Sequence, residues 1–461
     1  MIYKVENFKS LKTTGNIEVS PLTIFIGPNG TGKSSALQPL LFLSQTMANS
    51  RDDVGFLSNG KYIKIGNYFD FINAHDIKKK LKIFFDFDFK CRDCKEICYK
   101  DGKGKRIENT KVGDIPPAKY EIIFRCGKDY QPELEKITIY DCLDRVLLSR
   151  KKNGSRQYTI EFFSSIDDKN KEIYNSIVQQ MPQNFIFHDY DILNSVYRTD
   201  KEKHINKITE IKIEKGVSSY LTTIAYNKQN ILGNLARIKY VGPIREEAKR
   251  VYEYNKENYF EVGRFGEASA SILFQNIKQV EKKKELIKWL KIFGLAEDFR
   301  LTEIPNHPEL FGLEFKEKGK DYYINYADSC FGLSQLFPLL VQSVYSKIND
   351  IIIIEQPELH LNPSLESVLA DFFVDMIDKK KRLVIETHSE YLLLRLRTYI
   401  KEGKISNKKV ALYFTENIGG NSEIRKIDID ESGDFPNNDW PVGFFEESLA
   451  ENLMLATATK Q

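Results

Sequence analysis

Apolar and polar residues change their spacing several times along the chain, and each spacing predicts a different element. Short apolar stretches at 2–5 and 17–19 predict strands, and the continuous apolar run LTIFI at 22–26 predicts a buried strand that leads into a glycine-containing loop. Beyond this loop, apolar residues recur with helical spacing from about 34 to 46, with Pro39 as a candidate kink. We therefore expect strand, loop and helix to follow one another directly.

The middle of the chain has a different pattern. Between residues 81 and 163 the period becomes two, which is typical of strands with one buried face. From about 165 to 235 the pattern is more helical and more polar. The strand-like stretches are 81–89, 120–126, 134–140 and 158–163.

A Gly/Pro break, YVGPIREE at 240–247, marks the return to a compact core. After it, apolar strands alternate with helical stretches, which predicts a parallel sheet with crossover helices. We therefore predict an α/β fold whose core is split between residues 1–90 and 236–461, with an insertion at 91–235 that is β-rich and then helical. The expected elements after the break are helices near 268–293, a strand pair near 311–326, strands at 351–354 and 383–385, and helices at 363–377 and 390–400.

Composition adds a few limits to this picture. The 461 residues are 41% hydrophobic, enough for a large core, and the net charge of +3 neither requires nor excludes a nucleic-acid partner. No apolar run approaches the length of a membrane span, and the N-terminus lacks the apolar stretch of a secretion signal. We therefore expect a cytoplasmic protein with no membrane partner. Lysine runs at 78–80, 282–284 and 379–381 predict solvated faces, with a nucleic-acid or acidic-partner surface as the alternative.

The loop GPNGTGKSS, residues 27–35, fits the phosphate-binding pattern G-x-x-x-x-G-K-[ST]. Its glycines let backbone N–H groups turn towards phosphate, Lys33 would reach the β- and γ-phosphates, and the Ser34 hydroxyl would bind Mg²⁺. A chance match in a flexible turn is the alternative, but the strand before and the helix after favour nucleotide binding. The candidate nucleotide-binding residues of the loop are Asn29, Gly30, Gly32, Lys33, Ser34 and Ser35.

Two carboxylates follow the predicted strand at 351–354 in the sequence IIIIEQPELHLNP. Glu355 ends the strand, where it could hold Mg²⁺ or its waters, and Glu358 comes three residues later, after a proline that fixes the turn. Gln356 lies between them. Solvated acids at a strand end are the alternative interpretation.

Two further motifs place polar residues next to apolar elements. Gly332 and Ser334, in SCFGLSQ, come at the start of a predicted helix, where a small residue and a hydroxyl can meet phosphate oxygens or serve as an ordinary cap. His388 ends the predicted strand at 383–385, in ETHSE, where we expect it to sense a γ-phosphate or the attacking water. A structural histidine is the alternative there.

The order along the chain of the glycine loop, SCFGLSQ, IEQPELHLNP and ETHSE resembles that of the ABC-type P-loop ATPase heads of the SMC/RecF group, and within it the OLD-like ATPases of antiviral defence. GPIRE at 242–246, VGRFGE at 262–267 and DWPVGFFEES at 439–448 are also similar to short-tailed members. The resemblance covers about 1–90 and 236–450. The chain is most similar to the AriA-type ATPases of the PARIS systems, and second to the PtuA-type ATPases of Septu.

The resemblance implies an ATPase that uses ATP and Mg²⁺. Two copies would pair head to tail and sandwich the nucleotide, so that Lys33 and Ser34 of one copy face Gly332 and Ser334 of the other. His388 would read the γ-phosphate. The resemblance also implies that such homodimers assemble further.

The chain departs from the usual ABC pattern after the strand at 351–354. Most ABC heads carry Asp-Glu there, with the Glu as general base, whereas this chain has Glu355 and Gln356, and a glutamine cannot take a proton from water. Either Glu358 serves as the base or hydrolysis is slow, which would suit a switch. Gln45, on the predicted helix after the loop, is the candidate metal sensor implied by the resemblance.

No nuclease site is expected in this chain. The acidic cluster Asp428, Asp430 and Glu431 is more typical of a solvated strand end than of a metal site, and the six histidines are scattered. We therefore predict an ATP-binding and hydrolysing sensor or scaffold of a two-component antiphage system. It would hold a separate nuclease effector and release it on a phage-encoded trigger, with DNA allowed but not required. The alternatives are a DNA-stimulated SMC/RecF-like ATPase of DNA repair or maintenance, and a scaffold that binds ATP only for stability.

Three closely spaced cysteines could bind a structural zinc ion. Cys91, Cys94 and Cys98 supply three thiols, and Cys126 or His75 could complete the site. A second C-x-x-C pair is absent, so free thiols in a reducing compartment are the alternative.

Overall fold

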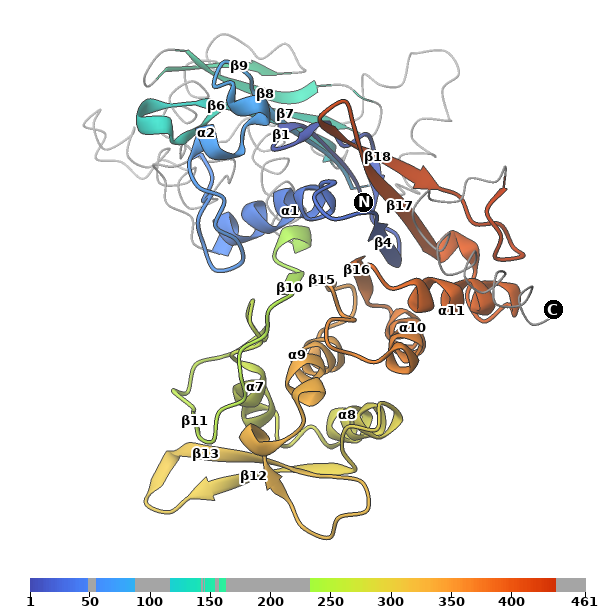
Figure 1. Cartoon of the computed structure of the whole chain (residues 1–461). Helices are drawn as coiled ribbons and strands as arrows, with labels where there is room; N and C mark the ends of the chain where they lie inside the picture. Colours follow the sequence, from blue (N-terminus) through green and yellow to red (C-terminus); the bar gives the residue numbers. More distant parts are fainter. Residues whose placement is uncertain are drawn as a thin grey trace, which may run out of the picture. The chain divides into compact units, whose positions relative to one another are not determined.

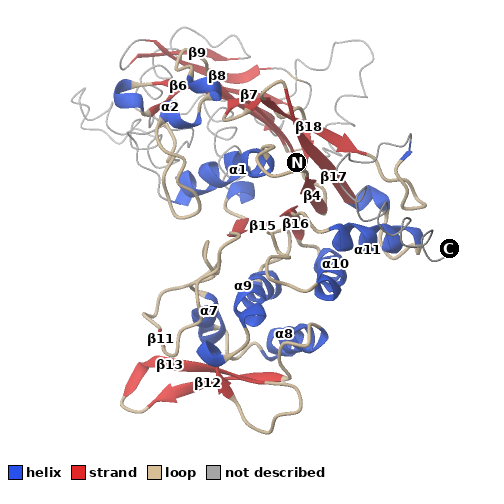
Figure 2. Cartoon of the chain, in the orientation of Figure 1, coloured by secondary structure: helices blue, strands red, loops and turns tan. Residues whose placement is uncertain are grey.

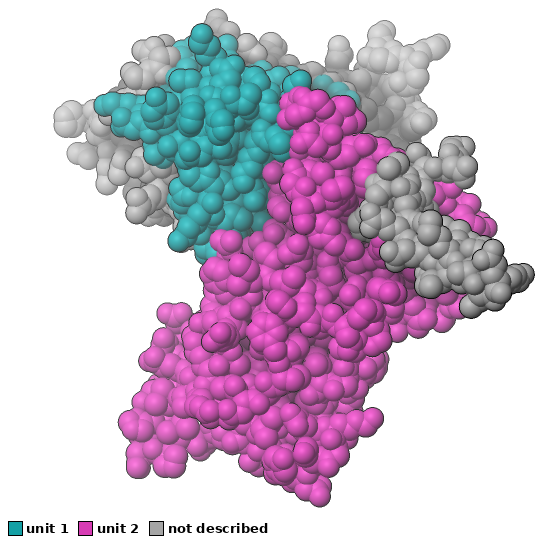
Figure 3. All heavy atoms as spheres, viewed as in Figure 1, with its two compact units in different colours: residues 1–17, 38–236 teal, residues 18–37, 237–461 magenta. Residues whose placement is uncertain are grey.

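The structure is a computed structural model that describes residues 1–48, 55–87, 117–141, 144, 146–153, 157–162 and 233–436 (Figure 1). The chain divides into two compact units (Figure 3). Unit 1 comprises residues 1–17 and 38–236, and unit 2 comprises residues 18–37 and 237–461. Unit 2 is therefore built from both ends of the chain, around an α/β core, and the predicted fold class is confirmed. The predicted boundaries at 90 and 235 stay a prediction.

The centre of unit 2 is a parallel sheet. Strands β10, β15, β16, β4 and β17 run in one direction in this order, and β18 lies antiparallel beside β17 (Figure 2). Strands β4 and β15 are buried along their whole length, which explains their unbroken apolar sequences. The strands are β4 (Leu22–Ile26), β10 (Ile238–Val241), β15 (Ile351–Glu355), β16 (Arg382–Glu386), β17 (Val410–Ile418) and β18 (Asn421–Ile427).

Helices connect the strands of unit 2, and side-chain caps fix where two of them begin. The Asn362 side chain accepts a hydrogen bond from the N–H of Leu365 at the start of α10, and Ser389 accepts one from Leu392 at the start of α11. Both helices therefore start shortly after a sheet strand ends. The helices are α1 (Lys33–Ala48, which continues into unit 1), α7 (Ser269–Gln275), α8 (Val280–Ile292), α9 (Phe331–Tyr345), α10 (Pro363–Asp378) and α11 (Glu390–Lys401).

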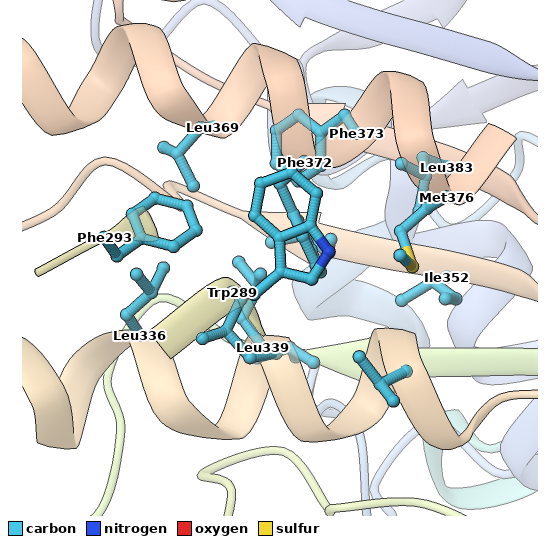
Figure 4. Packing of buried hydrophobic residues seen from close by; sticks show 14 of the residues in the cluster. Trp289, Phe293, Leu336, Leu339, Ile352, Leu369, Phe372, Phe373, Met376 and Leu383 are labelled. Carbon is cyan, nitrogen blue, oxygen red and sulfur yellow. The ribbon is translucent and has the colours of Figure 1, made fainter. Parts of the chain in front are cut away.

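Trp289 of α8 is at the centre of the apolar core of unit 2 (Figure 4). Its ring meets Phe372 of α10 edge to face with ring centroids 5.0 Å apart, and its N–H donates to Asp375 Oδ2 at 3.0 Å. Leu339 of α9 and Ile352 of β15 belong to the same cluster. This packing fixes α9 and α10 against the sheet, and truncation of such a buried Trp to Ala typically costs about 3–5 kcal/mol.

Unit 2 also contains a small antiparallel sheet, in the order β11, β13, β12, with β14 paired to β13. Its apolar face consists of Phe299, Phe311, Leu313 and Phe315, which join the core of unit 2. Strand β12, DFRLTEI, was not predicted because only Phe299 of its residues is buried. The strands are β11 (Tyr252–Glu253), β12 (Asp298–Ile304), β13 (His307–Lys316) and β14 (Ile324–Asn325).

Unit 1 contains an antiparallel sheet in the order β2, β1, β5, β6, β7, β8, β9. An aromatic cluster packs between this sheet and its helices: Phe56 stacks on Phe42 with centroids 4.4 Å apart and meets Phe124 edge to face at 4.7 Å. Its other elements are β3 (Ile17–Glu18), at the division between the units, and α2 (Tyr68–Phe71). The strands of the sheet are β1 (Ile2–Phe8), β2 (Leu11–Thr13), β5 (Leu81–Asp86), β6 (Pro117–Cys126), β7 (Pro132–Asp141), β8 (Val146–Asn153) and β9 (Gln157–Phe162).

Two expectations from the sequence concern the lysine run at 379–381 and the helical stretch at 165–235. The run at 379–381 is not wholly solvated, because Lys381 is 6% exposed and its ammonium donates to the carbonyl oxygens of Ser343 and Val344 at the end of α9. The helical stretch expected at 165–235 lies almost entirely outside the described residues. Among the described helices, none combines the length and apolar character needed to cross a membrane.

Candidate nucleotide-binding site

The candidate residues of unit 2 gather at the carboxyl edge of its parallel sheet. Strand β4 leads into the GPNGTGKSS loop, β15 ends at Glu355, β16 ends at Glu386, and Thr415 lies near the end of the parallel part of β17. Ligands of open α/β sheets bind at this edge because the loops after parallel strands meet there. The topology therefore brings together residues that are more than 300 positions apart in the sequence.

The phosphate-binding loop has the backbone conformation that its glycines permit. Gly30 and Gly32 have φ angles of 77° and 95°, a region that favours glycine. Gly27 has φ 140°, and a Cβ atom on it would lie 2.2 Å from the carbonyl oxygen of Thr415. A side chain at Gly27 would therefore push the loop off β17.

Two threonines hold the loop in place, and sequence reasoning missed both. The Thr31 hydroxyl lies 2.8 Å from the carbonyl oxygen of Pro28, to which it donates, and 2.6 Å from the Thr415 hydroxyl. Thr31 occupies a variable position of the motif, and no spacing relates it to Thr415, which is 384 residues away. Asn29 and Gly30, at the tip of the loop, are exposed.

Lys33 is the first residue of α1 and is only 4% exposed. Its ammonium donates to the carbonyl oxygens of Gly27 and Pro28, both at 2.9 Å. Burial lowers the pKa of Lys33, and the nearby carboxylates of Glu386 and Glu358 oppose this change. The ammonium group of Lys33 is therefore folded into the loop, next to the N-terminus of α1. Both the positive charge and the helix N-terminus favour phosphate oxygens as ligands.

Ser34 and Ser35 follow on the first turn of α1 and are half-buried. The Ser34 hydroxyl donates to Glu386 Oε1 at 3.0 Å. Glu386 is 5% exposed, and it lies beside Glu355 in the register of β15 and β16. Burial raises the pKa of Glu386 well above its usual range, and the Glu355 carboxylate raises it further. Sequence reasoning missed Glu386, although it stands within the ETHSE motif at the end of a strand predicted to be buried.

Glu355 is held from both sides of its strand end. The Tyr240 hydroxyl donates to Glu355 Oε1 at 2.9 Å, while the guanidinium of Arg245 donates to the carbonyl oxygens of Glu355 and Gln356, both at 3.2 Å. Arg245 is 5% exposed, and burial lowers its pKa to about 10. Gln356 has φ 47°, which is strained for a residue other than glycine. Arg245 therefore fixes the backbone turn that carries both side chains.

Glu358 and His388 are brought together. The N–H of His388 donates to Glu358 Oε1 at 2.7 Å. Burial raises the pKa of Glu358, and burial followed by the charge of Lys33 lowers the pKa of His388. A buried carboxylate whose pKa is raised takes a proton from water more readily than an exposed one, and the backbone of His388 holds this carboxylate in place.

Gln45 is placed differently from its predicted role as metal sensor. It belongs to unit 1, is fully buried, and its Oε1 accepts hydrogen bonds from the N–H groups of Tyr62 and Ile63 at 3.1 Å. Its amide nitrogen donates to the carbonyl oxygen of Leu57 at 2.7 Å. Because the side chain fastens this segment to α1, both lone pairs of its oxygen are already used.

Gly332 and Ser334 lie in the first turn of α9. The Ser334 hydroxyl donates to the carbonyl oxygen of Phe331 at 2.7 Å and is largely buried. Phe331 is 54% exposed, and its ring meets His360 edge to face with centroids 4.8 Å apart. A Cβ on Gly332 would approach no atom closer than 3.9 Å, that of Leu295 Cδ2. Among the described residues, none therefore requires a glycine at this position.

The residues at the sheet edge fit a nucleotide with Mg²⁺. Oε2 of Glu358, Oε2 of Glu386 and Nε2 of His388 are buried and have no hydrogen-bond partner in the described part of the chain. Buried polar atoms are normally paired, so these three atoms point to a polar ligand. Mg²⁺ typically binds one or two carboxylates together with phosphate oxygens and water. Within the described residues, no group of three or more His, Cys, Asp or Glu could hold a metal ion by itself.

The remaining candidate chemistry lies elsewhere. Cys91, Cys94 and Cys98, the predicted zinc ligands, lie outside the described residues, as does the DWPVGFFEES segment. Cys126 is a free, half-buried thiol, and His75 Nδ1 lies 2.8 Å from the carbonyl oxygen of Phe69. In the acidic cluster, Asp430 Oδ1 accepts the N–H groups of Ser432 and Asp434, so it closes a turn.

Comparison with solved structures finds heads of SMC proteins. An SMC head bound to the C-terminal winged-helix domain of ScpA is 14% identical, with 94% of this chain and 98% of that chain covered and a TM-score of 0.39. The SMC head domain from Thermotoga maritima is 9% identical, with 93% and 98% covered and a TM-score of 0.34. An SMC head with an extended coiled coil, bound to the C-terminal domain of ScpA and derived from Pyrococcus furiosus, is 13% identical, with 100% and 99% covered and a TM-score of 0.35.

Comparison with protein families gives a clearer result. No curated protein matches the chain. A family of unknown function, DUF3696, matches residues 405–455. The family described as an AAA ATPase domain, AAA_15, matches residues 2–393, which include the phosphate-binding loop, Glu355 and His388. This match spans well over half of the 461 residues, and the chain therefore belongs to the AAA ATPase domain family.

Proposed function

We propose that this ATPase works as a switch that binds Mg–ATP at the sheet edge of unit 2 and hydrolyses it slowly. The observation that carries the proposal is the arrangement after β15: Gln356 stands in the strained turn next to Glu355, while Glu358 bonds to the backbone of His388. The amide of Gln356 has no basic oxygen for a water proton. Glu358 is the base, and it acts from a position three residues further along the chain.

The ATP site is completed by a second copy of the chain. The start of α9 supports this step: Gly332 has open space around it, and Phe331 and Cys330 are exposed. A glycine in a helix lowers stability by about 0.5–1 kcal/mol relative to alanine. Because alanine would fit at position 332, the glycine there favours the close approach of a group from outside the chain. The phosphates of an ATP held by the partner are that ligand, with the helix N-terminus towards them.

We extend this proposal to the biological role that the family resemblance implies. The ATP-bound homodimer, assembled further into a larger homo-oligomer, holds a separate nuclease effector inactive and frees it when a phage-encoded protein is sensed. The proposed slow hydrolysis fits this role, because the ATP-bound dimer must keep the effector inactive until the trigger protein is present. Motor-like work on DNA would instead need turnover that DNA accelerates.

Expression of the tagged protein with its neighbouring genes tests the role. The proposal expects a second, nuclease-like chain to co-purify in the presence of ATP, and expects DNA to change steady-state ATP turnover by less than about twofold. Lys33→Ala serves as the control that removes the nucleotide. If the protein instead purifies alone and DNA raises its turnover more than about tenfold, the effector-holding role is wrong and DNA maintenance takes its place.

A further inference from the structure

Glu386 is a buried acid that the usual motifs of such a site leave unassigned. It ends β16, which lies between β15 and β4, so its neighbours in the sheet are Glu355 on one side and Phe25 on the other. A carboxylate that is 5% exposed loses most of its hydration, which is unfavourable unless charge or hydrogen bonds offset it. Its position beside the phosphate-binding strand therefore needs a reason.

The two carboxylate oxygens of Glu386 have different surroundings. Oε1 accepts the Ser34 hydroxyl at 3.0 Å, whereas Oε2 is buried without a partner among the described residues. Glu355, by contrast, has its Oε1 engaged by the Tyr240 hydroxyl, and Glu358 has its Oε1 engaged by the His388 backbone. Glu386 therefore bonds directly to the loop that would hold phosphate.

We propose that Glu386 positions the Mg²⁺ ion of the bound nucleotide together with Ser34. Its Oε1 accepts the hydrogen bond of the Ser34 hydroxyl, which leaves the lone pairs of the serine oxygen for the metal, and its Oε2 would accept a hydrogen bond from a water bound to that metal. Partners of this kind around a metal typically change its affinity by about 10–100-fold. The inference rests on the proposed ATP site and adds a residue to it.

The position of Glu386 also explains why an acid and not an amide stands there. Mg²⁺ dehydrates reluctantly and keeps several waters, which act as hydrogen-bond donors towards nearby carboxylates. A glutamine would accept the Ser34 hydroxyl through its oxygen, but its NH₂ group would then face those waters as a second donor. Glu386→Gln is thus a nearly isosteric change that removes only the charge and the second acceptor.

The test measures Mg²⁺ dependence of nucleotide binding by the full chain, with a fluorescent ATP analogue as probe. Affinity is determined in excess EDTA and at increasing Mg²⁺, for wild type, Glu386→Gln and the control Glu402→Gln, which changes an exposed acid paired with Lys404. We expect Glu386→Gln to raise the Mg²⁺ concentration at the midpoint at least about tenfold, and to leave nucleotide affinity in EDTA within about threefold of wild type. We expect Glu402→Gln to change neither quantity.

Several results would overturn the inference. An unchanged Mg²⁺ midpoint would do so, and so would equal weakening with and without Mg²⁺, because that pattern means Glu386 only supports the loop. Wild type that binds no nucleotide would overturn the proposed function as well, so the two failures are distinguishable. Should Glu386→Gln fail to fold, Glu386→Asp keeps the charge but draws it back from the metal, and an unchanged midpoint in that variant also contradicts the inference.

Ser34 provides a second readout through a double-mutant cycle. If Glu386 acts partly through the Ser34 hydroxyl, Ser34→Ala and Glu386→Gln shift the Mg²⁺ midpoint less together than the sum of their separate effects in free energy. Full additivity would show that the 3.0 Å hydrogen bond has no part in metal binding and would overturn the positioning role.

Discussion

The phosphate-binding loop and the start of α9 are both places where phosphate is expected, and they are built in opposite ways. At the loop, Lys33 is 4% exposed and turned inward, and three polar atoms nearby are buried without partners in the described part of the chain. At the start of α9, the Ser334 hydroxyl already bonds to Phe331, and the space around Gly332 is open. The loop therefore directs its polar groups inward, towards a bound ligand, whereas the start of α9 presents an open surface to an approaching partner.

This difference suggests how the two halves of the proposed shared site are stabilised. Buried atoms without partners cost folding free energy, about 1–3 kcal/mol each, and ligand binding recovers part of it. The start of α9 has none of these unpaired buried atoms among the described residues, and in the proposed dimer it joins a site only when a second copy approaches. We therefore expect changes in the loop to weaken nucleotide binding, and changes at the start of α9 to lower turnover without weakening binding.

The largest expected effect comes from Lys33→Ala. Two charge-assisted hydrogen bonds to phosphate, at about 1.5–3 kcal/mol each, would be lost, so affinity for Mg–ATP should fall at least about 100-fold. Calorimetric titration with Mg–ATP measures the effect. Lys318→Ala, which changes an exposed lysine, is the matched control and should bind like wild type. If Lys33→Ala bound Mg–ATP with an affinity within threefold of wild type, the loop would not be the nucleotide-binding site.

The next effect concerns the base. Glu358→Gln keeps the oxygen that accepts the His388 N–H but removes the basic oxygen, so turnover should fall about 100-fold with affinity unchanged. Gln356→Glu puts an acid directly after Glu355 and should raise turnover about tenfold. Phosphate release under saturating Mg–ATP measures both variants. A Glu358→Gln protein with wild-type turnover would show that another group is the base.

A smaller effect is expected at the start of α9. Gly332→Glu fits the open space and suits the first turn of a helix, but its charge would repel the phosphates bound to a partner. Affinity for Mg–ATP should stay within about threefold, while turnover falls about 10–100-fold. Gly332→Ala is the control for added volume. If Gly332→Glu turns over ATP normally, no second copy completes the site.

The smallest effect tests the far end of α9. Burial lowers the pKa of Lys381 to about 8, whereas the unfolded chain keeps its proton up to its ordinary pKa of 10.5. The unfolded state binds more protons between these values, so stability rises with pH there, by about 2 kcal/mol from pH 8 to pH 10. Urea unfolding of wild type and Lys381→Met at both pH values checks this. An identical rise in the variant would show that Lys381 does not cause it.

Much of the fold was predictable because its signals are local. The apolar runs of β4 and β15 and the glycines of the loop each reveal an element within a few residues. Strand β12 and strand β8 were missed because their sequences, DFRLTEI and VLLSRKKN, are largely polar. An apolar period cannot identify a strand whose buried side chains are few, as in β12, or polar, as Ser149, Arg150 and Lys152 are in β8.

The site was predictable only in part, for a related reason. Lys33, Ser34 and Glu355 stand at fixed positions of motifs, but the role of Glu386 depends on which strand lies next to which. Thr415 contacts Thr31 of the loop although the two residues are 384 positions apart. The hydrogen bonds of Gln45 to residues 57–63 depend on a turn that the sequence pattern does not predict. Sheet order and loop geometry carry this information.

The most direct test of a shared ATP site is the native mass of the Glu358→Gln variant with Mg–ATP, because this variant should retain the nucleotide. For a shared ATP site, we predict an assembly of paired chains with one ATP per chain. This assembly should dissociate when ATP is removed, and it should not form in Gly332→Glu. A single chain that keeps its ATP, together with wild-type turnover per molecule that does not change on dilution, would contradict it.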